Sequence, residues 1–152
     1  MALLVRGKNI SEKTFLATDY LNHFNEVVML LELVPDMPDC LADAKEWKPK
    51  SYVEHFRDST FSDKDLAIFA YENAPPRYRE PFDHTVAAMD RLIGEGIARI
   101  EAAIAADDPA RLAAHVNEIT TTLRRYIDIA SAIIHGDDDT LDQARIDAIM
   151  GG

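Results

Sequence analysis

The fold follows from residues 81–135, which read PFDHTVAAMDRLIGEGIARIEAAIAADDPARLAAHVNEITTTLRRYIDIASAIIH. Apolar residues recur there at intervals of three and four, the spacing of one buried face of an α-helix. The repeat is interrupted at Asp107-Asp108-Pro109, where Asp108 can cap a helix and Pro109 can occupy its first position. The segment therefore predicts two long helices, over about 81–107 and 109–135, and the short break between them makes them antiparallel neighbours.

A third amphipathic stretch precedes this pair. Ser11 can cap a helix over about 12–34, whose apolar residues show the same spacing and which Pro35 ends. Between residues 38 and 73 the pattern breaks into short pieces, and no segment of the chain alternates as a β-strand would. We therefore expect an all-α helical bundle with three long helices, in which short helices within 38–73 supply the fourth side.

Several helix boundaries can be read from local signals. Ser51 with Glu54 has the spacing of a capping box, and Ser62 is expected to cap the helix that follows it. The proline-rich run 74–81, APPRYREP, reads as a connection whose last proline opens the next long helix. Gly136 is expected to end the helix over 109–135.

Two glycines lie inside the helix predicted over 81–107. Relative to alanine, Gly94 and Gly96 would each weaken that helix by roughly 1 kcal/mol if exposed to solvent.

Composition narrows the classes of function. The chain has 152 residues, with 16 Lys and Arg against 27 Asp and Glu, and its net charge is −11. Such an acidic chain is a poor partner for nucleic acid or for an anionic membrane surface. A single cysteine, Cys40, excludes an internal disulfide framework, and we expect it to be a buried, inert thiol. The N-terminal sequence is a poor signal peptide, so we expect a cytoplasmic protein.

The histidines give the only candidates for a metal site. Two His-x-x-Glu pairs, His23 with Glu26 and His115 with Glu118, place an imidazole beside a carboxylate on a helix. If both helices faced each other, these four groups could hold a divalent metal; otherwise each pair hydrogen-bonds locally at the edge of its apolar stripe. No nucleophile or acid/base motif stands out, so we expect no catalytic residue, no cofactor and, on balance, no enzyme.

Residues 46–56, EWKPKSYVEHF, resemble the Trp, Pro, Ser and Glu-His run of the DinB-like bundle family. This resemblance implies a four-helix bundle. DinB-like proteins usually add two metal-binding histidines spaced by four on a later helix, and this chain lacks them. If the fold is related, the family's metal site is lost, and the resemblance supports a four-helix bundle and not an enzyme. A metal-binding bundle would have to use His55 together with His23 or His115.

The C-terminal residues form a separate unit by sequence. After a bundle domain over 1–136, residues 137–152 begin with three aspartates and continue as LDQARIDAIMGG, the pattern of a short amphipathic helix on a charged hinge. Thr140 with Gln143 has capping-box spacing at its start. A helix of this kind can lay its apolar face into a groove on a partner, and its aspartates favour a basic surface there.

The sequence of residues 141–152 resembles the N-terminal peptide of the flagellar motor switch protein FliM, which binds the phosphorylated chemotaxis regulator CheY. Phosphatases of the CheZ type also end in a short helix that binds CheY. The resemblance implies that this protein is a partner of a CheY-like receiver domain in chemotaxis or motility signalling. The implied contact residues are Leu141, Gln143, Ile146, Asp147, Ala148, Ile149 and Met150.

Three hypotheses remain open from sequence. The first is a non-enzymatic regulatory protein that binds a receiver domain through residues 137–152. The second is a DinB-like metal-binding bundle, and the third is a structural homo-oligomer in which the C-terminal helix packs within the assembly or folds back on its own bundle.

Overall fold

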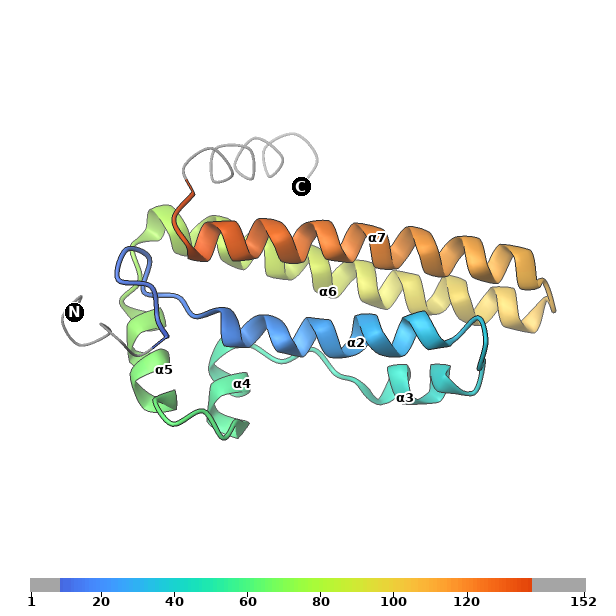
Figure 1. Cartoon of the computed structure of the whole chain (residues 1–152), viewed down its shortest axis with the longest axis horizontal. Helices are drawn as coiled ribbons and strands as arrows, with labels where there is room; N and C mark the ends of the chain where they lie inside the picture. Colours follow the sequence, from blue (N-terminus) through green and yellow to red (C-terminus); the bar gives the residue numbers. More distant parts are fainter. Residues whose placement is uncertain (1–8, 138–152) are drawn as a thin grey trace.

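The computed structural model describes residues 9–137, and these form a helical bundle without a β-strand (Figure 1). The all-α prediction is therefore confirmed. The described elements are a 3₁₀ turn, η1 (Thr18–Leu21), and the helices α2 (Asn22–Leu33), α3 (Cys40–Glu46), α4 (Tyr52–Asp58), α5 (Lys64–Glu72), α6 (Pro76–Ala105) and α7 (Pro109–Ile134).

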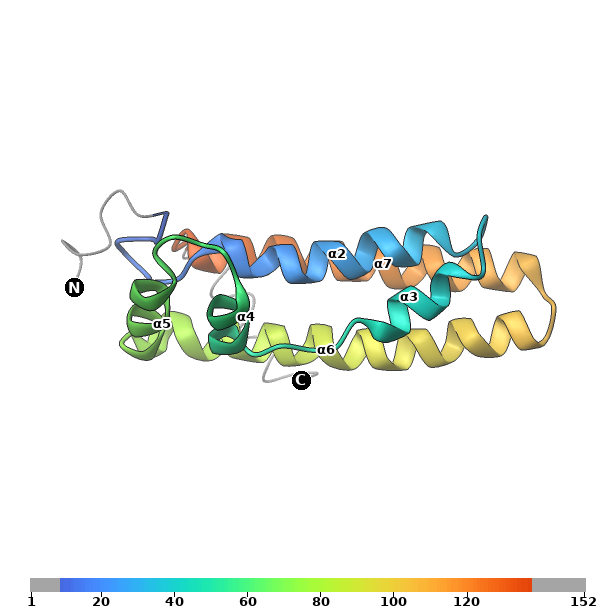
Figure 2. The ribbon, with the colours of Figure 1, turned by 90° about the horizontal axis from the view of Figure 1, so that it is seen from below.

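Helices α2, α6 and α7 run side by side along the length of the molecule, and α6 and α7 form an antiparallel hairpin (Figures 1 and 2). Helix α3 lies alongside α2 and α6 toward one end, whereas α4 and α5 lie across the bundle at the other end (Figure 2). The short helices thus fill the fourth side, as the sequence predicts. Surface ion pairs, Arg124 with Glu32 and Lys45 with Glu101, join α7 to α2 and α3 to α6.

Helix α7 follows its prediction closely. Pro109 is its first residue, and the carboxylate of Asp108 accepts a hydrogen bond from the backbone N–H of Arg111 at 3.1 Å. This side chain satisfies one of the free N–H groups of the first turn, and the proline has no N–H that would need a partner.

Helix α6 starts earlier than predicted, because residues 76–81 are helical and are not a connection. Pro76, not Pro81, takes the first helical position, and the backbone N–H of Arg79 donates to the carbonyl of Pro75 at 3.0 Å. Pro81 lies inside the helix, where it removes one backbone hydrogen bond. Burial of Tyr78 and Pro81 in this first part of the helix offsets that loss.

The first long helix starts later than predicted, at Asn22, after the short η1 turn. Ser11 caps no helix: its hydroxyl accepts from the backbone N–H of Thr14 at 3.2 Å within a short turn that stops at Phe15. Phe15 has a φ of 63°, which an α-helix cannot accommodate. The buried Leu16 and Ala17 continue in extended or irregular backbone.

The short helices α3, α4 and α5 occupy the predicted interval. Ser51 and Glu54 form the expected capping box at α4, with hydrogen bonds of 3.1 Å and 3.0 Å. The prediction for Ser62 is wrong: Asp63 takes the N-cap position of α5 and makes no side-chain cap bond to that helix. Cys40 is buried, as expected.

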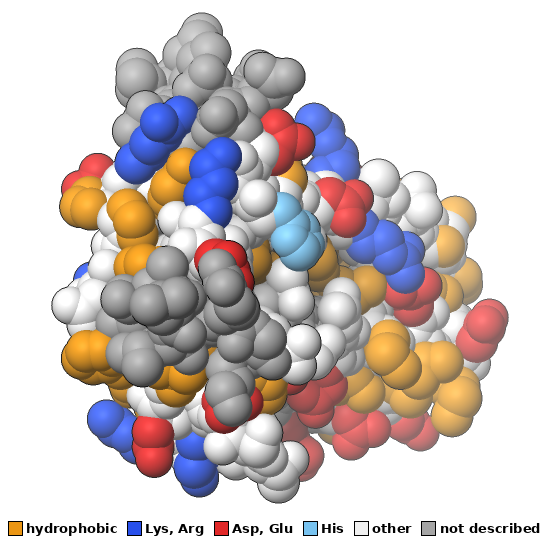
Figure 3. All heavy atoms as spheres, turned by 60° about the vertical axis from the view of Figure 1, so that its left-hand side comes forward, with side chains coloured by type: hydrophobic (Ala, Val, Ile, Leu, Met, Phe, Trp, Pro, Cys, Tyr) orange, Lys and Arg blue, Asp and Glu red, His pale blue; other side chains and the backbone are white. Residues whose placement is uncertain are grey.

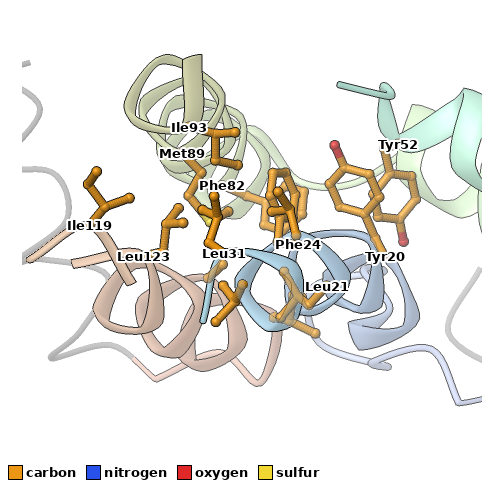
Figure 4. Close-up of a cluster of buried hydrophobic side chains, with 14 of the residues drawn as sticks. Tyr20, Leu21, Phe24, Leu31, Tyr52, Phe82, Met89, Ile93, Ile119 and Leu123 are labelled. Atoms are coloured by element: carbon orange, nitrogen blue, oxygen red, sulfur yellow. The ribbon is translucent and has the colours of Figure 1, made fainter. Parts of the chain in front are cut away.

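The core is built from the facing stripes of α2, α6 and α7 (Figure 4). Its largest fully buried side chains are Tyr20, Phe24, Phe56, Phe82, Leu16, Leu31, Met89, Ile93, Ile100, Ile119, Leu123 and Ile133. Gly96 is buried where α6 meets α7, and a Cβ built there would lie 2.8 Å from the Cδ1 atom of Ile119. The close approach of the two helices at this point therefore depends on glycine.

On the face seen in Figure 3, acidic and basic side chains are mixed with hydrophobic ones. None of the helices within residues 9–137 combines the length and the apolar character needed to span a bilayer.

Candidate functional site

The C-terminal end of α7 forms a complete helix stop. Gly136 has a φ of 77°, the left-handed conformation that follows many helices. Its N–H donates to the carbonyl of Ile133 at 2.9 Å, and the N–H of Asp137 donates to that of Ala132 at 3.0 Å. This pair of bonds is the Schellman motif, so Gly136 ends the helix as predicted.

The N-terminal loop holds this helix end in place. The Thr14 hydroxyl donates to the carbonyl of Ile134 at 2.6 Å, and the Lys13 ammonium donates to the carbonyl of Gly136 at 2.9 Å. Thr14 is fully buried. The end of α7 is therefore held by residues from both ends of the described chain.

The predicted partner-binding residues follow this point in the sequence. They lie outside the described residues: Leu141, Gln143, Ile146, Asp147, Ala148, Ile149 and Met150.

Two of the three candidate metal-binding histidines come together at the junction of η1, α2 and α4. The rings of His23 and His55 have centroids 6.3 Å apart. His23 is buried and stacks on Trp47 at 4.4 Å, while the Trp47 indole N–H donates to the His23 carbonyl at 2.8 Å. The backbone N–H of Lys50 donates to His23 Nε2 at 3.1 Å, which places the proton of the neutral ring on Nδ1.

Burial favours the neutral form of His23. The pKa of His23 is lowered to about 4, chiefly because the ring is removed from water and also because His55 and Lys50 are close. His55 has a different environment, since its Nε2 lies 2.9 Å from the carboxylate of Asp19. Both rings line an open cleft of about 490 Å³, together with Asn22, Glu26, Glu46, Trp47, Lys48, Lys50, Asp58 and Ser59.

His115 lies apart from this cleft, on α7 beside α6. The guanidinium of Arg99 bonds to His115 Nδ1 at 2.8 Å and to the Glu118 carboxylate at 3.1 Å. The pair is thus joined through an arginine of the neighbouring helix. Within residues 9–137, no group of three or more His, Cys, Asp or Glu side chains is arranged to hold a metal ion.

Two features of these sites have no signal in the sequence. Lys13 and Thr14 were not expected to contact the end of α7, because contacts across more than a hundred residues leave no local pattern. The stacking of Trp47 on His23 also joins residues far apart in the sequence, so no local pattern predicts it.

Comparison of the chain with protein-family models, with curated proteins and with solved structures found no match.

Proposed function

We propose that this protein is a non-enzymatic regulatory protein that binds a CheY-like receiver domain through residues 137–152, in chemotaxis or motility signalling. The observation that carries the proposal is the completed helix stop at Gly136 and Asp137, directly before the receiver-binding pattern. The last carbonyl groups of α7 already have hydrogen-bond partners, so the residues that follow are not needed to complete this helix. The cytoplasm, where CheY-like receivers act, is the location we propose.

The chemistry of the segment supports this partner. Leu141, Ile146 and Ile149 give it an apolar side, and five aspartates lie between 137 and 147 against the single cation of Arg145. Apolar anchors on a short helix supply affinity in a groove, and the acidic charge raises the association rate with a basic surface.

The test uses the full-length protein and the receiver domains encoded by the same genome. Each receiver is titrated with and without beryllofluoride, which mimics the phosphoryl group, and binding is measured by calorimetry. We expect one receiver to bind, and to bind more tightly when it carries the mimic. No binding to any receiver at several hundred micromolar would refute the proposal.

A matched pair of variants locates the contact. Ile149→Ser removes an apolar anchor and should weaken binding at least about tenfold, because burial of an isoleucine contributes roughly 1.5–3 kcal/mol. Ala144→Ser, at a position outside the implied contact set, should leave the affinity within about twofold. Equal loss in both variants, or in neither, would contradict the assignment.

The homo-oligomer alternative predicts a different result. If residues 137–152 pack between copies of the chain, Ile149→Ser should change the mass measured by sedimentation. If the segment binds only a receiver domain, the variant and the wild-type protein should have the same mass.

One observation favours a metal-binding bundle as a second candidate: His23 and His55 line the same cleft. If these rings contribute to a site, the purified protein should carry a divalent metal that is lost in His55→Ala and retained in His115→Ala. Metal-free protein of undiminished stability, with no uptake of added zinc, would eliminate this candidate.

A further inference from the structure

A second pocket, lined by residues within 9–137 and independent of the proposed function, lies where η1, α4 and α5 meet the first half of α6. It has a volume of about 300 Å³. The lining side chains that bear on its chemistry are Tyr20, Tyr52, Tyr71, Phe82, Asp83 and Asp90. Lys50 also lines the pocket, and its ammonium lies 3.2 Å from the carboxylate of Asp58. The pocket therefore combines an aromatic wall with two carboxylates and a lysine that is paired with a third.

The aromatic wall is continuous. Tyr52 and Tyr71 stack at 4.4 Å with 17° between their planes, and Tyr20 lies 5.2 Å from Tyr52. Tyr20 and Tyr52 lie side by side with their hydroxyl groups pointing in opposite directions (Figure 4). The Tyr20 hydroxyl donates to the Lys50 carbonyl at 2.6 Å, and the Tyr52 hydroxyl accepts from the Ala17 N–H at 2.9 Å. Both hydroxyls are thus engaged with backbone.

The two carboxylates lie on one side of α6, because seven residues make nearly two helical turns, about 10 Å along the axis. Asp83 already has partners: the Tyr71 hydroxyl donates to its Oδ1 at 2.8 Å, and Arg79 Nε lies 3.6 Å from its Oδ2. Asp90 differs, because its Oδ1 is shielded from solvent and has no hydrogen-bond partner within the described part of the chain.

An unpartnered buried carboxylate oxygen is unfavourable and calls for a donor. Burial raises the pKa of Asp90 to about 6, so the group is still mostly ionised at neutral pH. Aromatic faces attract cations through the ring quadrupole, and a carboxylate beside them adds charge and a hydrogen-bond acceptor. An anion is disfavoured by both aspartates.

We propose that this pocket binds a small aliphatic amine through its ammonium group, which donates to the Asp90 carboxylate while its methylene chain lies against the tyrosine rings. A primary ammonium fits better than a quaternary one, because only the primary group has N–H donors for a carboxylate oxygen. The volume lies at the lower end for ligand pockets and suits a chain of a few carbons. Asp83, which lies nearly two turns before Asp90 on α6, provides a second acceptor. A diamine is therefore the preferred ligand.

The experiment compares four small probes on the full-length protein at physiological ionic strength: putrescine, butylamine, tetramethylammonium and 1,4-butanediol. Binding is measured by calorimetry and by the NMR shifts of the tyrosine ring protons. We expect putrescine to bind most tightly, butylamine more weakly, and tetramethylammonium and butanediol weakest. Equal binding of putrescine and tetramethylammonium would overturn the proposal, since it would reflect only the acidic charge of the chain.

Two variants on α6 provide the matched comparison. Asp90→Asn keeps the shape and removes the charge, and it should weaken putrescine binding at least about tenfold, the size of a charge-assisted hydrogen bond. Glu95→Gln removes the same charge from an exposed position and should leave the affinity within about twofold. Equal affinity of Asp90→Asn and wild type would overturn the proposal. If Asp90→Asn fails to fold, the probe series on the wild-type protein gives the decision alone.

Discussion

Replacing Gly94 and Gly96 by alanine tests the packing of α6 against α7, because the two glycines lie two residues apart in very different surroundings. At Gly94 an added Cβ would meet nothing within 4 Å, so the substitution should only improve helix propensity. We expect Gly94→Ala to raise the free energy of unfolding by about 1 kcal/mol.

At Gly96 the same change is opposed by contact with the neighbouring helix. The added Cβ would lie 2.8 Å from Cδ1, 3.0 Å from Cγ2 and 3.2 Å from Cγ1 of Ile119, which is fully buried. Because three atoms of a β-branched side chain approach together, rotating only its terminal methyl group does not relieve the contact. Overpacking of this kind costs about 1–3 kcal/mol, against the gain of about 1 kcal/mol from propensity.

We therefore expect Gly96→Ala to be less stable than Gly94→Ala by about 1–3 kcal/mol in urea unfolding followed by circular dichroism. Adding Ile119→Val removes the nearest methyl group and should recover part of the loss, giving a favourable coupling in a double-mutant cycle. If Gly96→Ala raised the free energy of unfolding as much as Gly94→Ala does, the inference that α6 and α7 are in close contact at Gly96 would be wrong.

Three further substitutions probe the buried polar groups and the end of α7. His23 is held neutral in the folded protein, so between pH 6.5 and about 4 this histidine takes up a proton in the unfolded chain but not in the folded one. As the pH falls over this range, the free energy of unfolding of wild type should therefore decrease by about 3 kcal/mol relative to that of His23→Gln. Urea unfolding at each pH measures the difference. Thr14→Val removes the buried hydroxyl that donates to the Ile134 carbonyl and should cost about 1–3 kcal/mol. Thr122→Val removes an exposed hydrogen bond to the Glu118 carbonyl and should cost less than about 0.5 kcal/mol, so similar losses in the two variants would show that the Thr14 contact is unimportant. Gly136→Ala places a side chain on a residue with a φ of 77° and brings its Cβ to within 2.5 Å of Lys13 Cδ. We expect the free energy of unfolding to fall by at least about 1 kcal/mol. A melting temperature equal to that of wild type would contradict the described helix stop.

The sequence was informative where a structural signal is local. The three-and-four spacing identified α7 and most of α6, and the cap residues Asp108, Ser51 and Gly136 acted as predicted. Each depends on residues within one helical turn, so each leaves a pattern in the sequence.

The sequence was misleading where tertiary packing outweighs the local signal. Pro81 reads as the first residue of a helix, yet α6 begins five residues earlier, at Pro76, where Tyr78 is buried. The positive φ of Phe15 prevents a helix from starting near Ser11, so α2 begins later than predicted. Gly96 reads as a weak point of a helix, but only the structure shows that it gives Ile119 room.

The candidate sites follow the same division. The receiver-binding pattern could be found because its residues are consecutive, whereas the Asp90 pocket is assembled from four elements and has no sequence signature.

The contact between the N-terminal loop and the end of α7 also bears on how the chain could be reconnected. Lys13 and Gly136 are 123 residues apart in sequence, yet they are joined by one hydrogen bond. A short flexible linker could therefore connect the end of α7 to the N-terminal loop, with new termini opened in the surface connection between α4 and α5. Such a circular permutant should keep the packing of α6 against α7 while it reorders the chain, because two points that lie close together at the surface can be joined in this way.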